Sequence, residues 1–220
     1  MRYTDWTGTV KPTRIHLIRH GEVANAGVPR YNGHADVALS DRGVEQYRAL
    51  AVHFTRHAIT ACYSSDLTRC RTGAEMIGAG LGIGPAIEPA LRELNIGVWE
   101  GLTWDEIRSR WPREWDERLK DIVNYRVPGG ESLRDLEARI MPAFQRIVKA
   151  HPGEEVLVVA HGGTNRVILL NAIGAPLSSL FSIEQNYACC NIIDCYPDGN
   201  RVVKLLNGSG DESVHRCRAA

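Results

Sequence analysis

The chain has 220 residues, of which 44% are hydrophobic and 24% are charged, and its 26 basic residues balance 26 acidic ones. A net charge of zero argues against nucleic acid or an anionic membrane as the main partner, because surfaces that bind those polymers are strongly basic. A small anionic ligand needs only a local cluster of cations and remains compatible with this balance.

Residues 1–13 have no targeting character. They include Arg2, Asp5 and Lys11 and lack an apolar core, so we expect neither a signal peptide nor a transmembrane helix there. No later stretch reaches the roughly 20 apolar residues that a membrane span requires. The expectation is a soluble, cytoplasmic protein with one domain over residues 1–220 and flexible tails at 1–13 and 208–220.

The stretch Arg14–Glu22 predicts a buried strand that ends in reactive side chains. Its first half is apolar and β-prone, and Gly21 allows the tight turn that such a strand needs at its end. Ligands of open α/β sheets bind at the carboxyl ends of strands, which is where Arg19 and His20 fall. From this stretch alone, a structural histidine beside an ion-paired arginine is an equally good interpretation.

Strands alternate with helices along the rest of the chain, which indicates a three-layer α/β/α sandwich with a mainly parallel sheet. The last two strands flank the turn Pro197–Asn200 and are expected to form a hairpin. In chain order we expect a loop over the first strand end at 23–38, helices at 40–57, 67–79, 103–111, 112–124, 133–148 and through 167–170, strands at 59–63, 86–88, 155–160, 188–194 and 201–206, and an ordered loop at 91–101.

A second strand end repeats the pattern of the first. The continuous apolar run Glu155–Ala160 is followed by His161, Gly162 and another glycine. If both strands are central and parallel, His161 and His20 meet at one edge of the sheet, and Arg69 opens a helix at that same edge.

Two arginines and two histidines at one point predict a site for phosphate or another tetrahedral oxyanion. Guanidinium groups bind such oxygens in pairs, and a helix N-terminus adds partial positive charge. Histidine becomes useful when one ring nitrogen attacks phosphorus while a backbone carbonyl holds the other. A nearby carboxyl must then protonate the leaving oxygen and later accept a proton from water.

Five ordered motifs in this chain resemble those of the histidine phosphatase superfamily, the phosphoglycerate mutase-like clan, over residues 14–207. The motifs are Leu17–Glu22, Ser64–Arg69, Leu91–Glu93 with Gly97–Gly101, Gly129–Ser132 and Val158–Gly163.

The resemblance implies a role for each matched residue. His20 would be the phosphorylated nucleophile, and Arg19, Arg69 and His161, together with Gly162, would bind the phosphate. Glu93 would donate and accept the proton. The resemblance implies no metal and no organic cofactor.

Three positions are candidate substrate contacts. Many relatives carry Trp-Asn after the first motif, whereas this chain has Val23–Ala26, so Asn25 is the candidate for the phosphate-contacting asparagine. His34 follows in the same loop and could touch the substrate. Glu131 could lie near the pocket mouth, although it serves equally well as the start of the long helix.

Other candidates are given secondary roles. Glu22 and Glu100 are rival acids, and Glu100 is expected to order its own loop. His16, which alternates with buried strand positions, is expected to be structural, and Arg92 is expected at the surface or behind the site. All six cysteines are interpreted as free thiols, since none shows metal-ligand spacing: Cys62, Cys70, Cys189, Cys190, Cys195 and Cys217.

The expected function is hydrolysis of a small phosphorylated metabolite. The loop Gly97–Gly101 resembles that of phosphatase-type relatives, and the segment between Trp104 and Gly129 is shorter than in cofactor-dependent mutases. Residues 33–40 resemble the α-ribazole phosphatase branch and broad-specificity phosphatases. The alternatives are a cofactor-dependent phosphoglycerate mutase and a non-catalytic phosphate-sensing or protein-binding relative. A homodimer remains open, and neither nucleic acid nor membrane is an expected partner.

Overall fold

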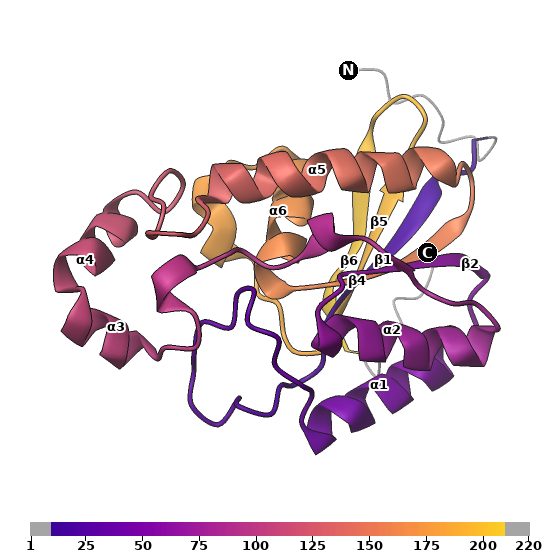
Figure 1. Cartoon of the computed structure of the whole chain (residues 1–220). Coiled ribbons are helices and arrows are strands. Elements are labelled where there is room, and N and C mark those ends of the chain that lie inside the picture. The colour runs from indigo at the N-terminus through magenta and orange to yellow at the C-terminus, as the bar shows by residue number, and fades with distance from the viewer. Residues whose placement is uncertain (1–9, 210–220) are drawn as a thin grey trace.

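The computed structural model describes residues 10–209 and arranges them as a six-stranded sheet between two layers of helices (Figure 1). The strand order is β3-β2-β4-β1-β5-β6, with β1 and β4 at the centre. Pairing is parallel from β3 to β1 and antiparallel for β1–β5 and β5–β6, which confirms the mostly parallel sandwich and the hairpin. The strands are β1 Thr13–Arg19, β2 Ile59–Ser64, β3 Ala86–Ile87, β4 Glu155–Ala160, β5 Cys190–Cys195 and β6 Arg201–Gly208.

Helices cover both faces of this sheet. In Figure 1, α1 and α2 lie on one side, α5 and α6 on the other, and α3 and α4 extend beyond the sheet edge. Three short 3₁₀ turns were not predicted, because segments of three to six residues are too short to show a helical period. The helices are α1 Asp41–Phe54, α2 Thr68–Leu81, α3 Trp104–Arg110, α4 Pro112–Lys120, α5 Leu133–Ala150 and α6 Gly162–Ile173, and the turns are η1 Pro89–Leu91, η2 Gly97–Trp99 and η3 Leu177–Ser182.

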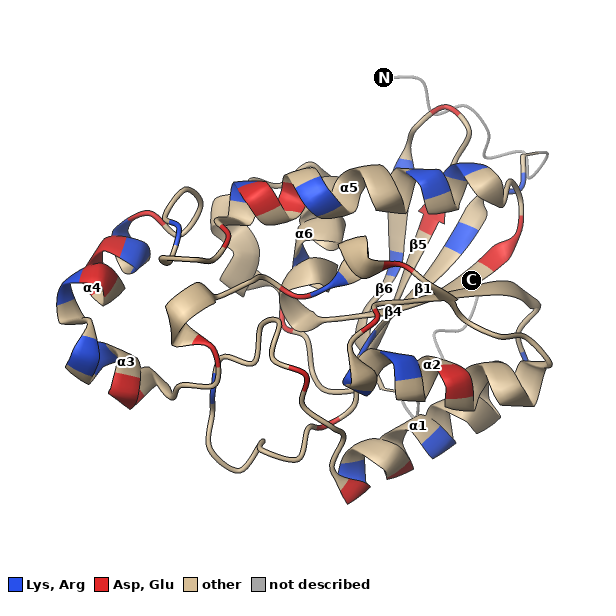
Figure 2. Ribbon diagram, in the orientation of Figure 1, with Lys and Arg blue, Asp and Glu red and all other residues tan. Residues whose placement is uncertain are grey.

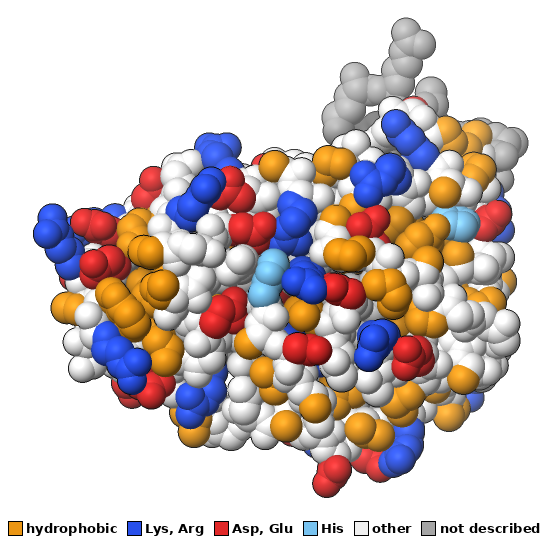
Figure 3. Space-filling model, viewed as in Figure 1, with side chains coloured by type: hydrophobic (Ala, Val, Ile, Leu, Met, Phe, Trp, Pro, Cys, Tyr) orange, Lys and Arg blue, Asp and Glu red, His pale blue; other side chains and the backbone are white. Residues whose placement is uncertain are grey.

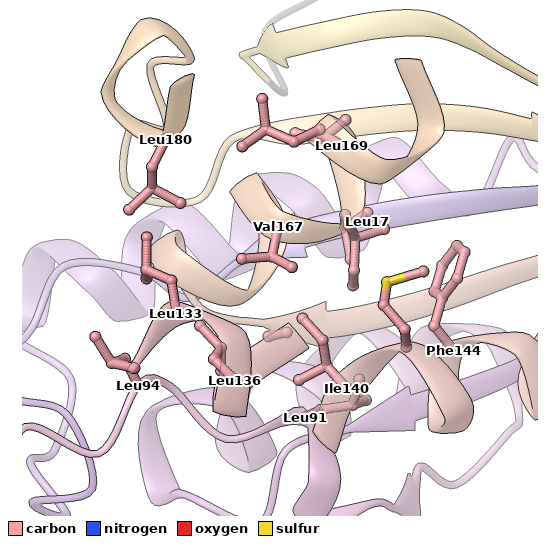
Figure 4. Close-up of a cluster of buried hydrophobic side chains, with 14 of the residues drawn as sticks. Leu17, Leu91, Leu94, Leu133, Leu136, Ile140, Phe144, Val167, Leu169 and Leu180 are labelled. Carbon is pink, nitrogen blue, oxygen red and sulfur yellow. The ribbon is translucent and has the colours of Figure 1, made fainter. Parts of the chain in front are cut away.

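Two hydrophobic clusters fill the space between the layers. Figure 4 shows the cluster under α5 and α6, where Leu17 of β1 meets Ile140 and Val167. The second cluster lies under α1 and α2 and contains the next residue of β1, Ile18. Since successive strand residues face opposite sides, β1 is buried on both faces and its end is held rigidly.

Side-chain caps set where the helices begin. Thr103 caps α3 as predicted, and Ser132 begins α5 in a capping box with Asp135. The residue at the N-cap position of α2, Leu67, has no side chain that can cap the helix. The carboxylate of Asp36 accepts instead from the Thr68 amide at 2.7 Å, so the loop over the strand end supplies the cap.

Several predicted boundaries need correction. Thr13 and Gly208 were placed in tails, but they belong to β1 and β6, and Thr13 is buried with its hydroxyl donating to the His151 carbonyl oxygen at 2.8 Å. The helices predicted to reach residues 57 and 124 end at Phe54 and Lys120. The remaining tail residues, 1–9 and 210–220, lie outside the described residues.

The mixed charge of the surface and the free state of the described cysteines are as expected from the sequence. Lys and Arg are interspersed with Asp and Glu along the helices (Figure 2) and over the face shown in Figure 3. The five cysteines in the described part of the chain are buried free thiols, and Cys217 lies outside it.

Within residues 10–209, no helix has the length and apolar character needed to cross a membrane.

Candidate functional site

A cavity of about 270 Å³ lies at the carboxyl end of β1, between the beginnings of α2 and α6. This is the sheet edge at which the sequence predicted an anion site. The residues lining the cavity are Arg19, His20, Arg30, Tyr31, Asn32, Gly33, Arg69, Glu93, Leu94, Ile96, Trp104, Arg118, Leu133, Gly162, Gly163, Arg166, Leu180, Phe181 and Tyr187.

His20 directly follows β1 and is only 6% exposed. Its Nδ1 lies 2.8 Å from the Gly21 carbonyl oxygen. Because that oxygen can only accept, Nδ1 carries the proton and Nε2 keeps its lone pair. Burial, and then the charges of Arg19 and Arg69, hold the pKa of the His20 imidazole well below its ordinary value. The ring is therefore neutral near pH 7, as a nucleophile must be.

Arg19, the last residue of β1, lines the cavity. It donates to the Gln185 carbonyl oxygen and lies 4.1 Å from the centroid of the Tyr187 ring. Its Nε is buried and has no hydrogen-bond partner in the described structure. A Cβ at Gly162 would lie 3.3 Å from this nitrogen, so glycine keeps the space in front of it open.

Arg69, the second residue of α2, is 1% exposed. Its two amino groups donate to the carbonyl oxygens of Ala35 and Gly33 at 2.7 Å, and its Nε, like that of Arg19, is buried without a partner. Both guanidinium groups are thus held by neutral backbone oxygens. Two desolvated positive charges with unused N–H groups make a site for an anion.

His161 connects β4 to α6 and is fully buried. Its ring centroid lies 5.2 Å from that of His20, and its Nε2 lies 2.9 Å from the Ser65 hydroxyl oxygen. Burial, followed by the charge of Arg69, holds the pKa of the His161 imidazole well below its ordinary value. The second histidine therefore adds a neutral, oriented ring beside His20 rather than a further charge.

Glu93 lines the same cavity and is fixed by backbone amides. Oε2 accepts from the Gly163 amide at 2.9 Å, and Oε1 accepts from the Thr164 and Leu94 amides at 3.2 and 2.9 Å. The first turn of α6 thus holds the carboxyl at the cavity wall. A Cβ at position 163 would lie 2.4 Å from Oε1, so the second glycine of the motif makes room for this carboxyl.

The structure brings five predicted residues to the cavity wall, Arg19, His20, Arg69, Glu93 and Gly162, with His161 packed beside His20.

Three other candidate contacts do not line the cavity. Asn25 forms a reciprocal amide pair with Asn32, which does line it. His34 lies with Nε2 2.9 Å from the Glu93 carbonyl oxygen, and Glu131 forms an ion pair with Arg139 at 2.7 Å. These side chains brace the loops around the site.

The rival acids have structural partners. Glu22 Oε1 accepts from the Ser40 hydroxyl at 2.8 Å, at the start of α1. Glu100 accepts from the amides of His34, Ala35 and Ile96, which confirms that it orders its loop. Arg92 forms an ion pair with Asp66 behind the cavity.

Sequence reasoning missed several lining residues. Arg166 lies four residues after Gly162 on α6, a spacing that places both on one helix face, and this signal was available. Burial, and then the charge of Arg19, lower the pKa of the Arg166 guanidinium. Arg118 is 4% exposed with one buried amino group unpaired, and it reaches the cavity only through the packing of α4, which no local pattern predicts.

Comparison with known proteins identifies a family that matches this chain. The model of the histidine phosphatase superfamily (branch 1) matches residues 15–208. A metal-independent phosphoserine phosphatase of Arabidopsis thaliana is 36% identical over 172 residues, which cover 75% of this chain and 72% of that protein.

A second relative is much longer than this chain, and a solved structure has the same fold. A bifunctional protein of Mycobacterium tuberculosis, Rv2228c, is 33% identical over 207 residues, which are 93% of this chain but only 57% of the relative. The chain thus spans little more than half the length of that protein. The structure of the alpha-ribazole phosphatase of Shigella flexneri superimposes with a TM-score of 0.82 at 24% identity, covering 90% of this chain and 97% of that one, and supports the fold.

Proposed function

The chain belongs to the histidine phosphatase superfamily, and we propose that it hydrolyses small phosphomonoesters, without a metal, through a phosphohistidine on His20. The observation that carries the proposal is the pair of buried, unpaired Nε atoms of Arg19 and Arg69 beside a histidine whose Nε2 keeps its lone pair. This set can bind a phosphoryl group and supply the nucleophile that attacks it.

The reaction follows from these positions in two displacements. His20 Nε2 attacks phosphorus and forms a P–N bond while the P–O bond to the substrate breaks, and Glu93 gives its proton to the leaving oxygen. Water then attacks the phosphohistidine, Glu93 takes the proton, and inorganic phosphate and neutral His20 are restored. Arg19 and Arg69 stabilise the charge on the transferring phosphoryl oxygens in both steps.

The cavity also suggests a substrate class. At about 270 Å³ it lies just below the usual range for ligand pockets, which favours a small metabolite. Arg118 and Arg166 add cationic groups to its lining and suit a substrate with a second negative group, such as the carboxylate of phosphoserine. The phosphoserine phosphatase activity named for the Arabidopsis relative is consistent with this.

The test is a phosphatase assay with chelator present, on a metabolite panel that pairs phosphoserine with phosphoethanolamine, its analogue lacking the carboxylate. We expect turnover by the wild type, a preference for phosphoserine, and acid-labile phosphate trapped on the protein. His20→Ala should lose both turnover and trapped phosphate, whereas His151→Ala, at a distant histidine that contacts Glu154, should keep them.

Two results would overturn the proposal. One is a wild type that hydrolyses nothing on the panel, which favours the non-catalytic alternative. The other is isomerisation of phosphoglycerate, in the presence of its bisphosphate, that outpaces hydrolysis, which favours the mutase.

A further inference from the structure

A second group of histidines lies beside the amino-terminal half of β1, away from the phosphate cavity. His16 stands in the middle of β1, Glu155 begins β4, and His57 lies in the turn between α1 and β2. His16 is four residues before His20, about 13 Å along an extended strand. Arg14 pairs with Glu155 and His16 pairs with Leu157, so Glu155 lies diagonally across from His16 on the same face of the sheet.

We propose that His16, His57 and Glu155 form a binding site for a divalent transition metal such as Zn²⁺. One potential ligand atom from each side chain lies within 4.8 Å of the other two. Glu155 Oε2 is 3.0 Å from His16 Nε2 and 3.8 Å from His57 Nδ1.

These distances suit tetrahedral coordination. Zinc–nitrogen and zinc–oxygen bonds of about 2.0–2.1 Å at a tetrahedral angle place neighbouring ligand atoms about 3.3 Å apart. The two measured spacings lie on either side of that value. Because the His57 side chain is 28% exposed, a small rotation of its ring can close the remaining gap.

The donor set also selects the metal. Two imidazoles and one carboxylate bind zinc in many proteins, with a fourth position left for water, whereas Mg²⁺ and Ca²⁺ favour all-oxygen sites. The nearest guanidinium on the strand, that of Arg14, is neutralised by two hydrogen bonds to Asp194 at 2.7 and 2.9 Å. Arg14 therefore does not compete with a metal ion for the Glu155 carboxylate.

The proposed metal site is buried on the side of His16 and accessible to solvent on the side of His57. The His16 side chain is 1% exposed and packs edge-on against Phe54, while the Glu155 side chain is 21% exposed beside His57. A metal can therefore enter from solvent past His57. Bound there, it would tie the end of α1 to the two central strands without touching the phosphate cavity.

The test compares Zn²⁺ binding to the chelator-stripped full chain and to His57→Ala by calorimetry. His57 is chosen because truncating the buried His16 could unfold the chain. We expect the wild type to bind one more equivalent than the variant, or to bind that equivalent at least about tenfold more tightly. Zn²⁺ should also raise the midpoint of thermal unfolding in the wild type only.

His151→Ala is the matched control. It removes an imidazole whose Nδ1 lies 3.0 Å from Glu154, yet no third potential ligand joins that pair within the described residues. This variant should keep the extra equivalent. Co²⁺ gives a second readout, since tetrahedral Co²⁺ absorbs strongly in the visible, and the bands should disappear in both His57→Ala and Glu155→Gln.

Two outcomes would overturn the proposal. One is that the wild type and His57→Ala bind the same number of Zn²⁺ ions equally tightly. The other is that the only bound ion is displaced by inorganic phosphate, which would place it at His20. Neither outcome bears on phosphatase activity, which is measured with chelator present.

Discussion

One pair of histidines lies at the carboxyl end of β1 and a second pair lies beside its amino-terminal half, and the two pairs differ in the charges around them. The rings of His20 and His161 are 5.2 Å apart, and those of His16 and His57 are 5.0 Å apart. The first pair lies beside the guanidinium groups of Arg19 and Arg69, whereas the second shares Glu155. Imidazole pairs of one spacing are therefore suited to an anion at one end and to a cation at the other.

The topology explains why the charges separate in this way. At the carboxyl ends of the parallel strands, α2 and α6 begin, and the partial positive charge of their N-termini lies beside the cavity. At the opposite end, α1 finishes at Phe54, and His57 follows its C-terminus, where carbonyl groups favour positive charge. The helix directions thus reinforce the side-chain charges at both ends.

The largest effect is expected from replacing Glu93, the proposed proton donor of the anion site. In Glu93→Gln, kcat/KM for an alkyl phosphate should fall about 10²- to 10⁴-fold, because alkoxide is a poor leaving group without a proton. The loss for p-nitrophenyl phosphate should be much smaller, since p-nitrophenolate leaves unprotonated. Steady-state kinetics on the two substrates measures the difference.

Glu22→Gln is the control for this prediction. Glu22 was the rival acid, and its carboxylate accepts from Ser40 outside the cavity. It should leave both substrates nearly unaffected. An equal loss for the two substrates in Glu93→Gln would contradict the proton-donor role.

The next largest effect should come from removing one of the two buried positive charges. Arg69→Gln takes away a donor aimed at the transferring phosphoryl group, and kcat/KM should fall about 10²- to 10³-fold. Inhibition by inorganic phosphate should weaken in parallel. Arg71→Gln, on the same helix but half exposed and paired with Glu75, should change either value by no more than about twofold. Phosphate inhibition that is unchanged in Arg69→Gln would show that this arginine does not hold the anion.

The candidate anion site could be predicted largely from sequence because its histidines and arginines lie at the ends of regular elements. Two apolar runs ending in histidine and glycine, and an arginine at a helix start, must meet if the strands are parallel. Glu93 was found through the family motif alone. Its contacts with the Gly163 and Thr164 amides depend on how the loop that carries Glu93 packs against the start of α6.

The metal candidate could not be predicted in this way. His16 was interpreted as structural, and neither His57 nor Glu155 stands near it in the sequence. Their meeting depends on the register of β1 against β4 and on where α1 ends, which are products of packing. The position of Tyr187, which stacks on Arg19, could not be predicted either, because the segment that carries it has no recognisable sequence motif.

The smallest expected effect concerns stability and follows from the depressed pKa of His20. Below about pH 6.5 the unfolded chain takes up a proton at this position, whereas the folded chain does not until its lower pKa is reached. The free energy of unfolding should therefore fall as the pH decreases from about 6.5 toward that folded pKa. The slope from this group is at most about 1.4 kcal/mol per pH unit.

His20→Asn should flatten the curve of unfolding free energy against pH by that amount, relative to the wild type, when urea unfolding is followed between pH 5 and 7. Above about pH 7 the two curves should run parallel, because neither state of the wild type is protonated at His20. Parallel curves over the whole range would mean that the folded chain protonates His20 as readily as the unfolded one. Below about pH 6.5 the ring would then share its pocket with Arg19 and Arg69 as a third cation, and only the fraction of molecules with a neutral ring would keep a lone pair for attack.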